Sequence, residues 1–177
     1  KKKKKMLAYI LENYNGRLII DADGLNNLAD MDSGYLLKTN ASVILTPHVK
    51  EFSRLSGKSC EEILNEPIKY AKEYAKKYGV IILLKGTATV ITDGDTVYIS
   101  DTGCAGMATA GSGDVLSGIL TGIMGFAKDD ELLFSTAAGA YINGLCGEMA
   151  QKKFTSVGMT SSDTASLIPQ ILKSFDV

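Results

Sequence analysis

The sequence is poor in the residues from which metal centres and disulfide frameworks are built. It contains one histidine, His48, and its three cysteines, Cys60, Cys104 and Cys146, are widely spaced. Because it has neither a CxxC pair nor a cysteine–histidine cluster, the sequence does not predict a structural zinc site. An odd number of cysteines without a signal peptide is typical of a reducing compartment, so we expect a cytoplasmic protein.

Charge and hydropathy exclude two further classes of function. The formal net charge is -1, which gives no general attraction to nucleic acid. No apolar stretch reaches the length of about 18 residues that suggests a membrane span, so we expect no membrane partner. The basic run Lys1–Lys5 is interpreted as a solvated terminal segment without a function. The remaining composition, 45% hydrophobic over 177 residues, is enough for a real core, and we expect a single domain over residues 1–177.

Helical and strand patterns alternate along the chain, which favours an α/β domain with a mainly parallel sheet. Strands are expected at residues 17–21, 43–45 and 80–84, followed by a hairpin of residues 89–92 and 96–99 around Asp93-Gly94. Helices are expected at residues 6–14, 25–29, 51–55, 61–78, 114–124, 131–150 and 164–174. Gly57 is expected to end the third helix. Pro67 is expected to bend or split the fourth helix, and Gly79 to end it.

The most informative segment is TGCAGMATAGSGDVLSGIL, residues 102–120. Its glycines allow the backbone to approach a ligand closely, and the segment then enters an apolar helix whose free N–H groups form a natural anion site. Asp114, at the start of that helix, is either a favourable first-turn acid or a base that takes a proton during phosphoryl transfer. The spacing matches neither the Walker pattern nor GxGxxG, so neither a P-loop nor a Rossmann site is supported.

Polar side chains also follow three of the expected strands. DADGLN (21–26) brings Asp21 and Asp23, TPHVKE (46–51) brings His48 and Glu51, and LLKGTAT (83–89) brings Lys85. Each has a plain alternative role: the acids and the histidine can cap helices, and the lysine can lie in a surface turn. The aspartates can equally bind a metal ion or phosphate-bound Mg²⁺. Because ligands bind at the carboxyl edge of open α/β sheets, we expect these groups to converge on one cleft of a nucleotide-using enzyme.

Taken together, DADGLN, TPHVKE, LLKGTATV, GMATAGSGDVLSG and GMTSSDTASLIP resemble the ADP/ATP-dependent NAD(P)H-hydrate dehydratases, a branch of the ribokinase-like superfamily. The match runs in order from about Arg17 to the end of the chain. The resemblance implies a ribokinase-like three-layer fold with a mainly parallel central sheet. Because the family domain is longer at its amino end, we expect this chain to be a carboxy-terminal portion that lacks the amino-terminal part.

The resemblance also implies an activity, the removal of water from NADHX or NADPHX to restore NADH or NADPH. This is a carbon–oxygen lyase reaction of metabolite repair that uses ADP or ATP as co-substrate, with Mg²⁺. Asp114 takes the catalytic and substrate-binding position, His48 takes a substrate-contact position, and Glu51 matches an acid that acts on Mg²⁺ through water. We expect a homo-oligomer whose nucleotide contacts are Lys85, Gly86, Thr87, Ala88, Thr89, Gly111, Ser112 and Gly113.

Four positions depart from the family pattern: Val49-Lys50 replaces a common Pro-Gly, Cys104 a frequent Asn, Ala110 a frequent Gly and Asn143 a common His. Two alternatives remain open. One is a small-molecule kinase of the same superfamily, acting on a vitamin precursor alcohol. The other is a nucleotide-binding fragment without catalysis. TPHVKE together with GMATAGSGDVLSG favours the dehydratase.

Overall fold

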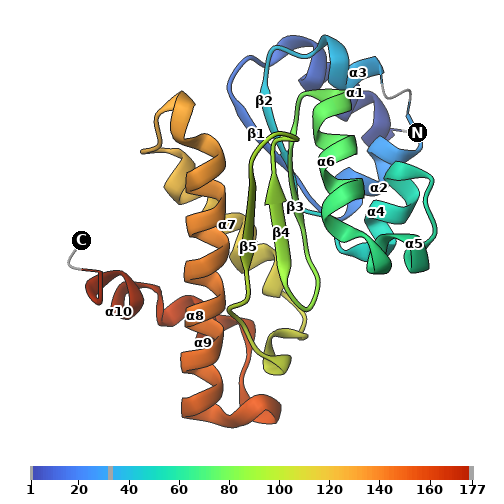
Figure 1. Cartoon of the computed structure of the whole chain (residues 1–177). Helices are drawn as coiled ribbons and strands as arrows, with labels where there is room; N and C mark the ends of the chain where they lie inside the picture. Colours follow the sequence, from blue (N-terminus) through green and yellow to red (C-terminus); the bar gives the residue numbers. More distant parts are fainter. Residues whose placement is uncertain (1, 32–33, 176–177) are drawn as a thin grey trace. The chain divides into compact units, whose positions relative to one another are not determined.

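The computed structural model describes residues 2–31 and 34–175, which fold into two compact units, Lys1–Ile99 and Ser100–Val177 (Figure 1). The elements of the first unit are α1 (Lys2–Asn13), β1 (Arg17–Ile20), α2 (Asp23–Ala29), α3 (Gly34–Lys38), β2 (Ser42–Leu45), α4 (Val49–Ser56), α5 (Cys60–Asn65), α6 (Pro67–Tyr78), β3 (Ile81–Leu84), β4 (Thr89–Thr92) and β5 (Val97–Ser100), the last of which ends at the boundary. Those of the second are η1 (Ala105–Met107), α7 (Ser112–Met124), η2 (Asp129–Glu131), α8 (Leu132–Gly158), α9 (Ser161–Ser166) and α10 (Ile168–Lys173).

The five strands form one sheet in the order β1-β2-β3-β4-β5. β1 pairs with β2 and β2 with β3 in parallel, whereas β4 lies antiparallel to β3. The turn after β4 is held by the Asp93 side chain, whose Oδ1 accepts hydrogen bonds from the Asp95 and Thr96 amides at 3.0 and 2.9 Å. The expected α/β class, mainly parallel sheet and terminal hairpin are therefore confirmed.

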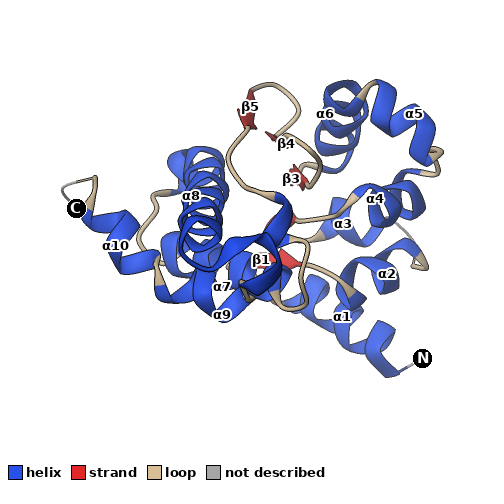
Figure 2. Cartoon of the chain, turned by 90° about the horizontal axis from the view of Figure 1, so that it is seen from below, coloured by secondary structure: helices blue, strands red, loops and turns tan. Residues whose placement is uncertain are grey.

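The core of the first unit lies between the sheet and its helices. Figures 1 and 2 show α2, α4 and α6 to one side of the strands. Alternate strand residues such as Leu45 and Ile82 pack there against Phe52 of α4 and the tyrosines of α6. Each such fully buried side chain contributes about 1.5–3 kcal/mol. The intervening residues Ile44 and Leu83 are also fully buried, as expected of strands that are apolar at every position.

Proline and glycine divide the helices at the expected places. Pro67 splits the expected helix of residues 61–78 into α5 and α6, because its ring cannot follow a preceding helical turn. Gly57 and Gly79, with φ of 71° and 64°, end α4 and α6 in the left-handed conformation that glycine adopts without strain. The expected helix of residues 164–174 is also two helices, α9 and α10.

The lysine run is more structured than its interpretation as a solvated terminal segment implied. From Lys2 onward it forms the start of α1, where Lys3 Nζ lies 2.6 Å from Asp23 Oδ2 and Lys4 Nζ lies 2.8 Å from Asp30 Oδ2. These acids neutralise charges that would otherwise repel each other along one helix. Lys1 lies outside the described residues.

Small residues let the helices of the second unit approach one another closely. A Cβ atom at Gly139 of α8 would come within 2.7 Å of Leu120 Cδ2 of α7, so a larger residue there would displace the leucine side chain. A second cluster, of Cys146, Ala150, Met159, Leu167 and Ile171, joins α8 to α9 and α10. Among residues 2–31 and 34–175, no helix is both long and apolar enough to cross a membrane.

Candidate functional site

The carboxyl ends of β1, β2 and β3 bring three of the predicted segments together. The Thr46 amide donates to Ile20 O at 3.2 Å, and the Lys85 amide donates to Pro47 O at 2.8 Å. A parallel bridge joins His48 to Lys85 beyond the ends of the strands. The backbone pairing of the sheet thus continues into the loops. It places DADGLN, TPHVKE and LLKGTAT at one edge of the sheet, as predicted for the segments that follow these strands.

Asp21 and Lys85 form an ion pair at this edge, with Lys85 Nζ 3.1 Å from Asp21 Oδ1. Their side chains are only 18% and 27% exposed, so solvent screens the pair less than it screens a surface ion pair. Sequence reasoning selected both residues but not their contact. Asp23 behaves differently, because it lies at the surface and pairs with Lys3.

The turn that carries Asp21 is strained. The Gly24 amide donates to Asp21 O at 2.9 Å, which closes a four-residue turn. Ala22, the second residue of this turn, has φ 48° and ψ -117°, a conformation that normally requires glycine. The Ala22 amide donates to Asp21 Oδ1 at 2.8 Å, so the turn also fixes the carboxylate.

His48 and Glu51 form a capping box at the start of α4. His48 Nδ1 accepts from the Glu51 amide at 3.2 Å, and Glu51 Oε2 accepts from the His48 amide at 3.0 Å. The plain capping role considered for both residues is therefore present. Because Nδ1 is an acceptor, the proton of a neutral His48 resides on Nε2, which makes the half-exposed edge of the ring a hydrogen-bond donor.

Glu51 is nearly inaccessible, with 8% of its side chain exposed. Its Oε2 serves the cap, and its Oε1 lies 3.4 Å from His48 Nε2. A buried carboxylate with one oxygen held in a cap fits contact with a cation through water better than direct ligation. No group of three or more His, Cys, Asp or Glu residues suited to a metal ion occurs in the part of the chain that the structure describes.

The glycine-rich segment of the second unit has two different halves. In the first half the Gly103 amide donates to Glu148 Oε1 at 2.9 Å, and the Gly106 amide donates to Gln151 Oε1 at 3.3 Å. These amides are bound to α8 and are not free for an anion, contrary to the expectation that the whole segment would approach a ligand. Sequence reasoning did not select Glu148 or Gln151, because nothing local to α8 indicates a partner 45 residues away.

The second half ends in the open start of α7. Gly111, the N-cap residue, has φ 86° and provides no capping side chain. The Ser112 amide donates to Thr109 O at 3.3 Å, which leaves the first-turn amides of Gly113 and Asp114 without an intrahelical partner. The Asp114 side chain is exposed at this point. Of the amides in the predicted anion site, those of residues 113 and 114 thus remain available to a ligand.

Ser161, at the start of α9, lies beside the same turn. A Cβ atom at Gly111 would come within 2.6 Å of Ser161 Oγ, so the serine hydroxyl occupies space that a larger residue 111 would need. The segment GMTSSD was part of the family resemblance, but Ser161 itself was not selected as a site residue. Its hydroxyl is a further polar group next to the start of α7.

These arrangements can be compared with those of known proteins. A family model described as NAD(P)H-hydrate dehydratase matches residues 1–170. The chain belongs to the NAD(P)H-hydrate dehydratase family. This confirms the resemblance stated from the strand-end and glycine-rich motifs.

Individual relatives agree with the family assignment. The chain is 41% identical to the ADP-dependent (S)-NAD(P)H-hydrate dehydratase of Nitrosopumilus maritimus over 79% of its own length and 48% of the relative. It is 28% identical to a Bacillus subtilis ADP/ATP-dependent NAD(P)H-hydrate dehydratase co-crystallized with ATP/Mg²⁺, with a TM-score of 0.82, covering 93% of this chain and 57% of that one.

A ribokinase-like superfamily protein from Enterococcus faecalis is 26% identical, with a TM-score of 0.82, and the match covers 97% of this chain and 58% of that one. The ribokinase-like fold expected from the motifs is therefore confirmed. This member of the dehydratase family spans about half the length of the curated relative from Nitrosopumilus maritimus.

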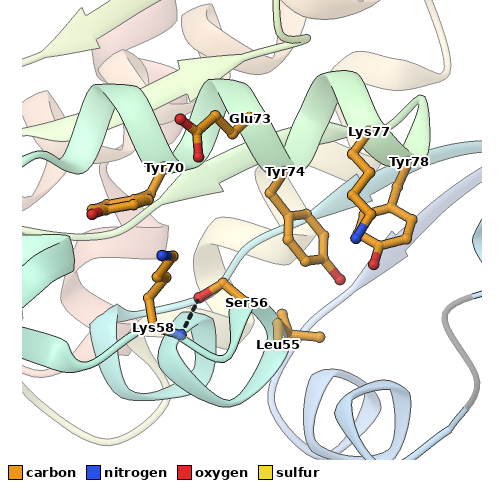
Figure 3. Close-up of a pocket in the computed structure, with 8 residues that line it drawn as sticks. All are labelled: Leu55, Ser56, Lys58, Tyr70, Glu73, Tyr74, Lys77 and Tyr78. Atoms are coloured by element: carbon orange, nitrogen blue, oxygen red, sulfur yellow. Dashed lines mark hydrogen bonds between the residues drawn. The ribbon is translucent and has the colours of Figure 1, made fainter.

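A cavity elsewhere in this dehydratase-family chain does not qualify as a nucleotide site (Figure 3). It has a volume of about 170 Å³, below the 300–1,000 Å³ typical of small-molecule sites. Lysine ammonium groups lie over two of its tyrosine rings, Lys58 at 5.1 Å from Tyr70 and Lys77 at 5.0 Å from Tyr78. The cavity is lined by Leu55, Ser56, Lys58, Tyr70, Glu73, Tyr74, Lys77 and Tyr78.

Proposed function

We propose that the protein of which this chain forms part catalyses the dehydration of NADHX or NADPHX to NADH or NADPH, with ADP or ATP as co-substrate. The observation that carries the proposal is the family match over residues 1–170. Two of the named relatives are dehydratases of NAD(P)H-hydrate, one ADP-dependent and the other ADP/ATP-dependent. We further propose that the protein acts in the cytoplasm, since its three cysteines are free thiols, and that it forms a homo-oligomer.

We propose two groups of nucleotide contacts, one in each of the two units, for reasons that lie within each unit. One is the loop Lys85–Thr89, where the lysine supplies a positive charge and residues 86–88 are exposed. The other is Gly111–Gly113, where the start of α7 has unpartnered amides and a favourable dipole. His48 is assigned to the hydrated cofactor, to which it would donate a hydrogen bond from Nε2.

Mg²⁺ is proposed as the counter-ion of the nucleotide phosphates, whose developing charge it would neutralise when bound. Glu51 fits a role in holding it through water, because its side chain is only 8% exposed and Oε2 is held in the α4 cap. Direct ligation through Oε2 would break the α4 cap, whereas contact through water would leave the cap intact.

Asp114 is proposed as the general base. Its carboxylate accepts the proton of the ring hydroxyl as the hydroxyl oxygen attacks the terminal phosphorus of ADP or ATP, and the bond from that phosphorus to the bridging oxygen breaks. The phosphorylated ring then loses inorganic phosphate by cleavage of its carbon–oxygen bond, and a proton leaves the neighbouring ring carbon as the double bond forms. General-base assistance of this type is typically worth about 10² to 10⁴ in rate.

The proposal is tested by incubating the protein with NADHX, Mg²⁺ and either nucleotide while the absorbance of the reduced ring is followed. Recovery of NADH that depends on nucleotide supports the dehydratase. A stable phosphorylated alcohol would indicate a small-molecule kinase, and nucleotide binding without turnover would indicate a binding module. Asp114→Asn should reduce turnover about 10²- to 10⁴-fold and leave ADP affinity unchanged or higher. Asp130→Asn, an exposed acid of η2, is the control.

A further inference from the structure

We propose that Asp21 is a positioning residue that holds the ammonium group of Lys85 in place for the nucleotide phosphates. The inference rests on the proposed function, in which Lys85 is a nucleotide contact, and it extends that function by one residue. Three features of the first unit carry it: the ion pair, the strained turn that presents the carboxylate, and the contrast with the neighbouring Asp23.

A lysine side chain is a flexible support for a phosphate-binding charge. It has a four-carbon stem and about 2 kcal/mol of rotamer entropy, which must be lost when the ammonium group is fixed. The Lys85 backbone is fixed by its bond to Pro47 O, and the far end of the side chain is held by its bond to Asp21. One of the three ammonium N–H donors is used there, and two remain for phosphate oxygens.

The local backbone is arranged so that the carboxylate meets this lysine. Asp21 Oδ1 accepts from both the Ala22 amide and Lys85 Nζ, at 2.8 and 3.1 Å. The turn contains alanine at a position that favours glycine, which costs about 1–3 kcal/mol. Backbone strain of this kind persists where the surrounding structure over-determines it, which occurs most often at functional sites.

Asp23 provides an internal comparison, because it lies two residues away and also pairs with a lysine. The side chains of Asp23 and Lys3 are 75% and 70% exposed, against 18% and 27% for Asp21 and Lys85. An exposed pair is screened by water and holds neither side chain firmly. Only Asp21 lies at the sheet edge together with His48, so only its pair is expected to affect a ligand at that edge.

The experiment measures ADP and adenosine binding by calorimetry, or by competition where binding is weak, to the wild type, Asp21→Asn and the control Asp23→Asn. Thermal unfolding midpoints establish that each variant is folded. Asp21→Asn should weaken ADP binding about tenfold or more, as expected when a hydrogen bond to a charged group is lost. Adenosine binding should not change, because adenosine has no phosphate, and Asp23→Asn should resemble the wild type with both compounds.

A double-mutant cycle with Lys85→Gln tests whether Asp21 acts through the lysine. In the Lys85→Gln background, Asp21→Asn should weaken ADP binding less than about twofold. An undiminished effect in that background, an equal loss of adenosine binding, or ADP affinity equal to or above that of Asp23→Asn would overturn the inference. Should Asp21→Asn fail to fold, Asp21→Glu, which keeps the charge but displaces it by one methylene, should show the same selective loss of ADP binding, and unchanged binding would overturn the inference.

The failure of this inference is distinguishable from that of the proposed function. A wild-type protein that binds no adenine nucleotide overturns the proposed function and the inference with it. A wild type that binds ADP while Asp21→Asn binds it equally well overturns the inference alone.

Discussion

Replacement of Ala22 by glycine should make the protein more stable, although glycine usually destabilises. Ala22 has φ 48° and ψ -117°, and relief of this strain should return about 1–3 kcal/mol. The additional freedom of glycine in the unfolded chain offsets about 0.4–1 kcal/mol. A net gain of about 0.5–2 kcal/mol follows, which for a chain of this size raises the midpoint of thermal unfolding by about 2–6 °C.

The assay is urea unfolding followed by circular dichroism, with the slope compared between variants to verify that the same transition is measured. The matched control is Ala8→Gly, which makes the same substitution inside α1. There glycine should cost about 1 kcal/mol, because the residue is helical and unstrained. If Ala22→Gly lowers the stability, or changes it in the same direction as Ala8→Gly, the turn is not strained and the argument from it fails.

Three further predictions concern the second unit and the alkaline stability of the first. Gly111→Ala should lower the stability by about 1–2 kcal/mol in a thermal melt, because residue 111 has a positive φ. Gly118→Ala should raise the stability of the protein, because a Cβ atom there meets open space and alanine favours the helix α7; equal effects of the two substitutions would contradict this. Burial raises the pKa of the Cys146 thiol to about 11, so at neutral pH it should react with a thiol reagent far more slowly than the half-buried Cys104. Equal reaction rates of the two thiols would show that Cys146 is accessible. Burial also raises the pKa of Tyr74, so stability should fall as pH rises above about 10, and Tyr74→Phe should lessen that fall in unfolding titrations.

Features set by local chemistry could be predicted from the sequence. Gly57, Gly79 and Gly94 all adopt positive φ, and each follows directly from a helix-end or hairpin signal in its own segment. Pro67 divides a helix for an equally local reason. The convergence of the strand ends at one edge of the sheet was also predictable, because parallel strands place their carboxyl ends together.

Features that depend on partners distant in sequence could not be predicted. The bond from the Gly103 amide to Glu148 and the ion pair of Asp21 with Lys85 join residues 45 and 64 positions apart. Local patterns assign such side chains to a loop or a helix face but do not select a partner. The helical structure of the lysine run was missed for the same reason, since its compensating acids Asp23 and Asp30 lie at the two ends of α2. The roles assigned to Asp114, His48, Glu51 and the nucleotide loops stay predictions.

The order of strands in the sheet has a consequence for how the chain acquires its structure during synthesis. The spatial order β1-β2-β3-β4-β5 is also the order in which the ribosome produces the strands. At about 5–20 residues per second, each new strand can dock on the edge left by the previous one, and none has to insert between two strands already paired. The first unit is thus suited to vectorial, cotranslational assembly, in which the growing edge of the sheet moves with the emerging chain.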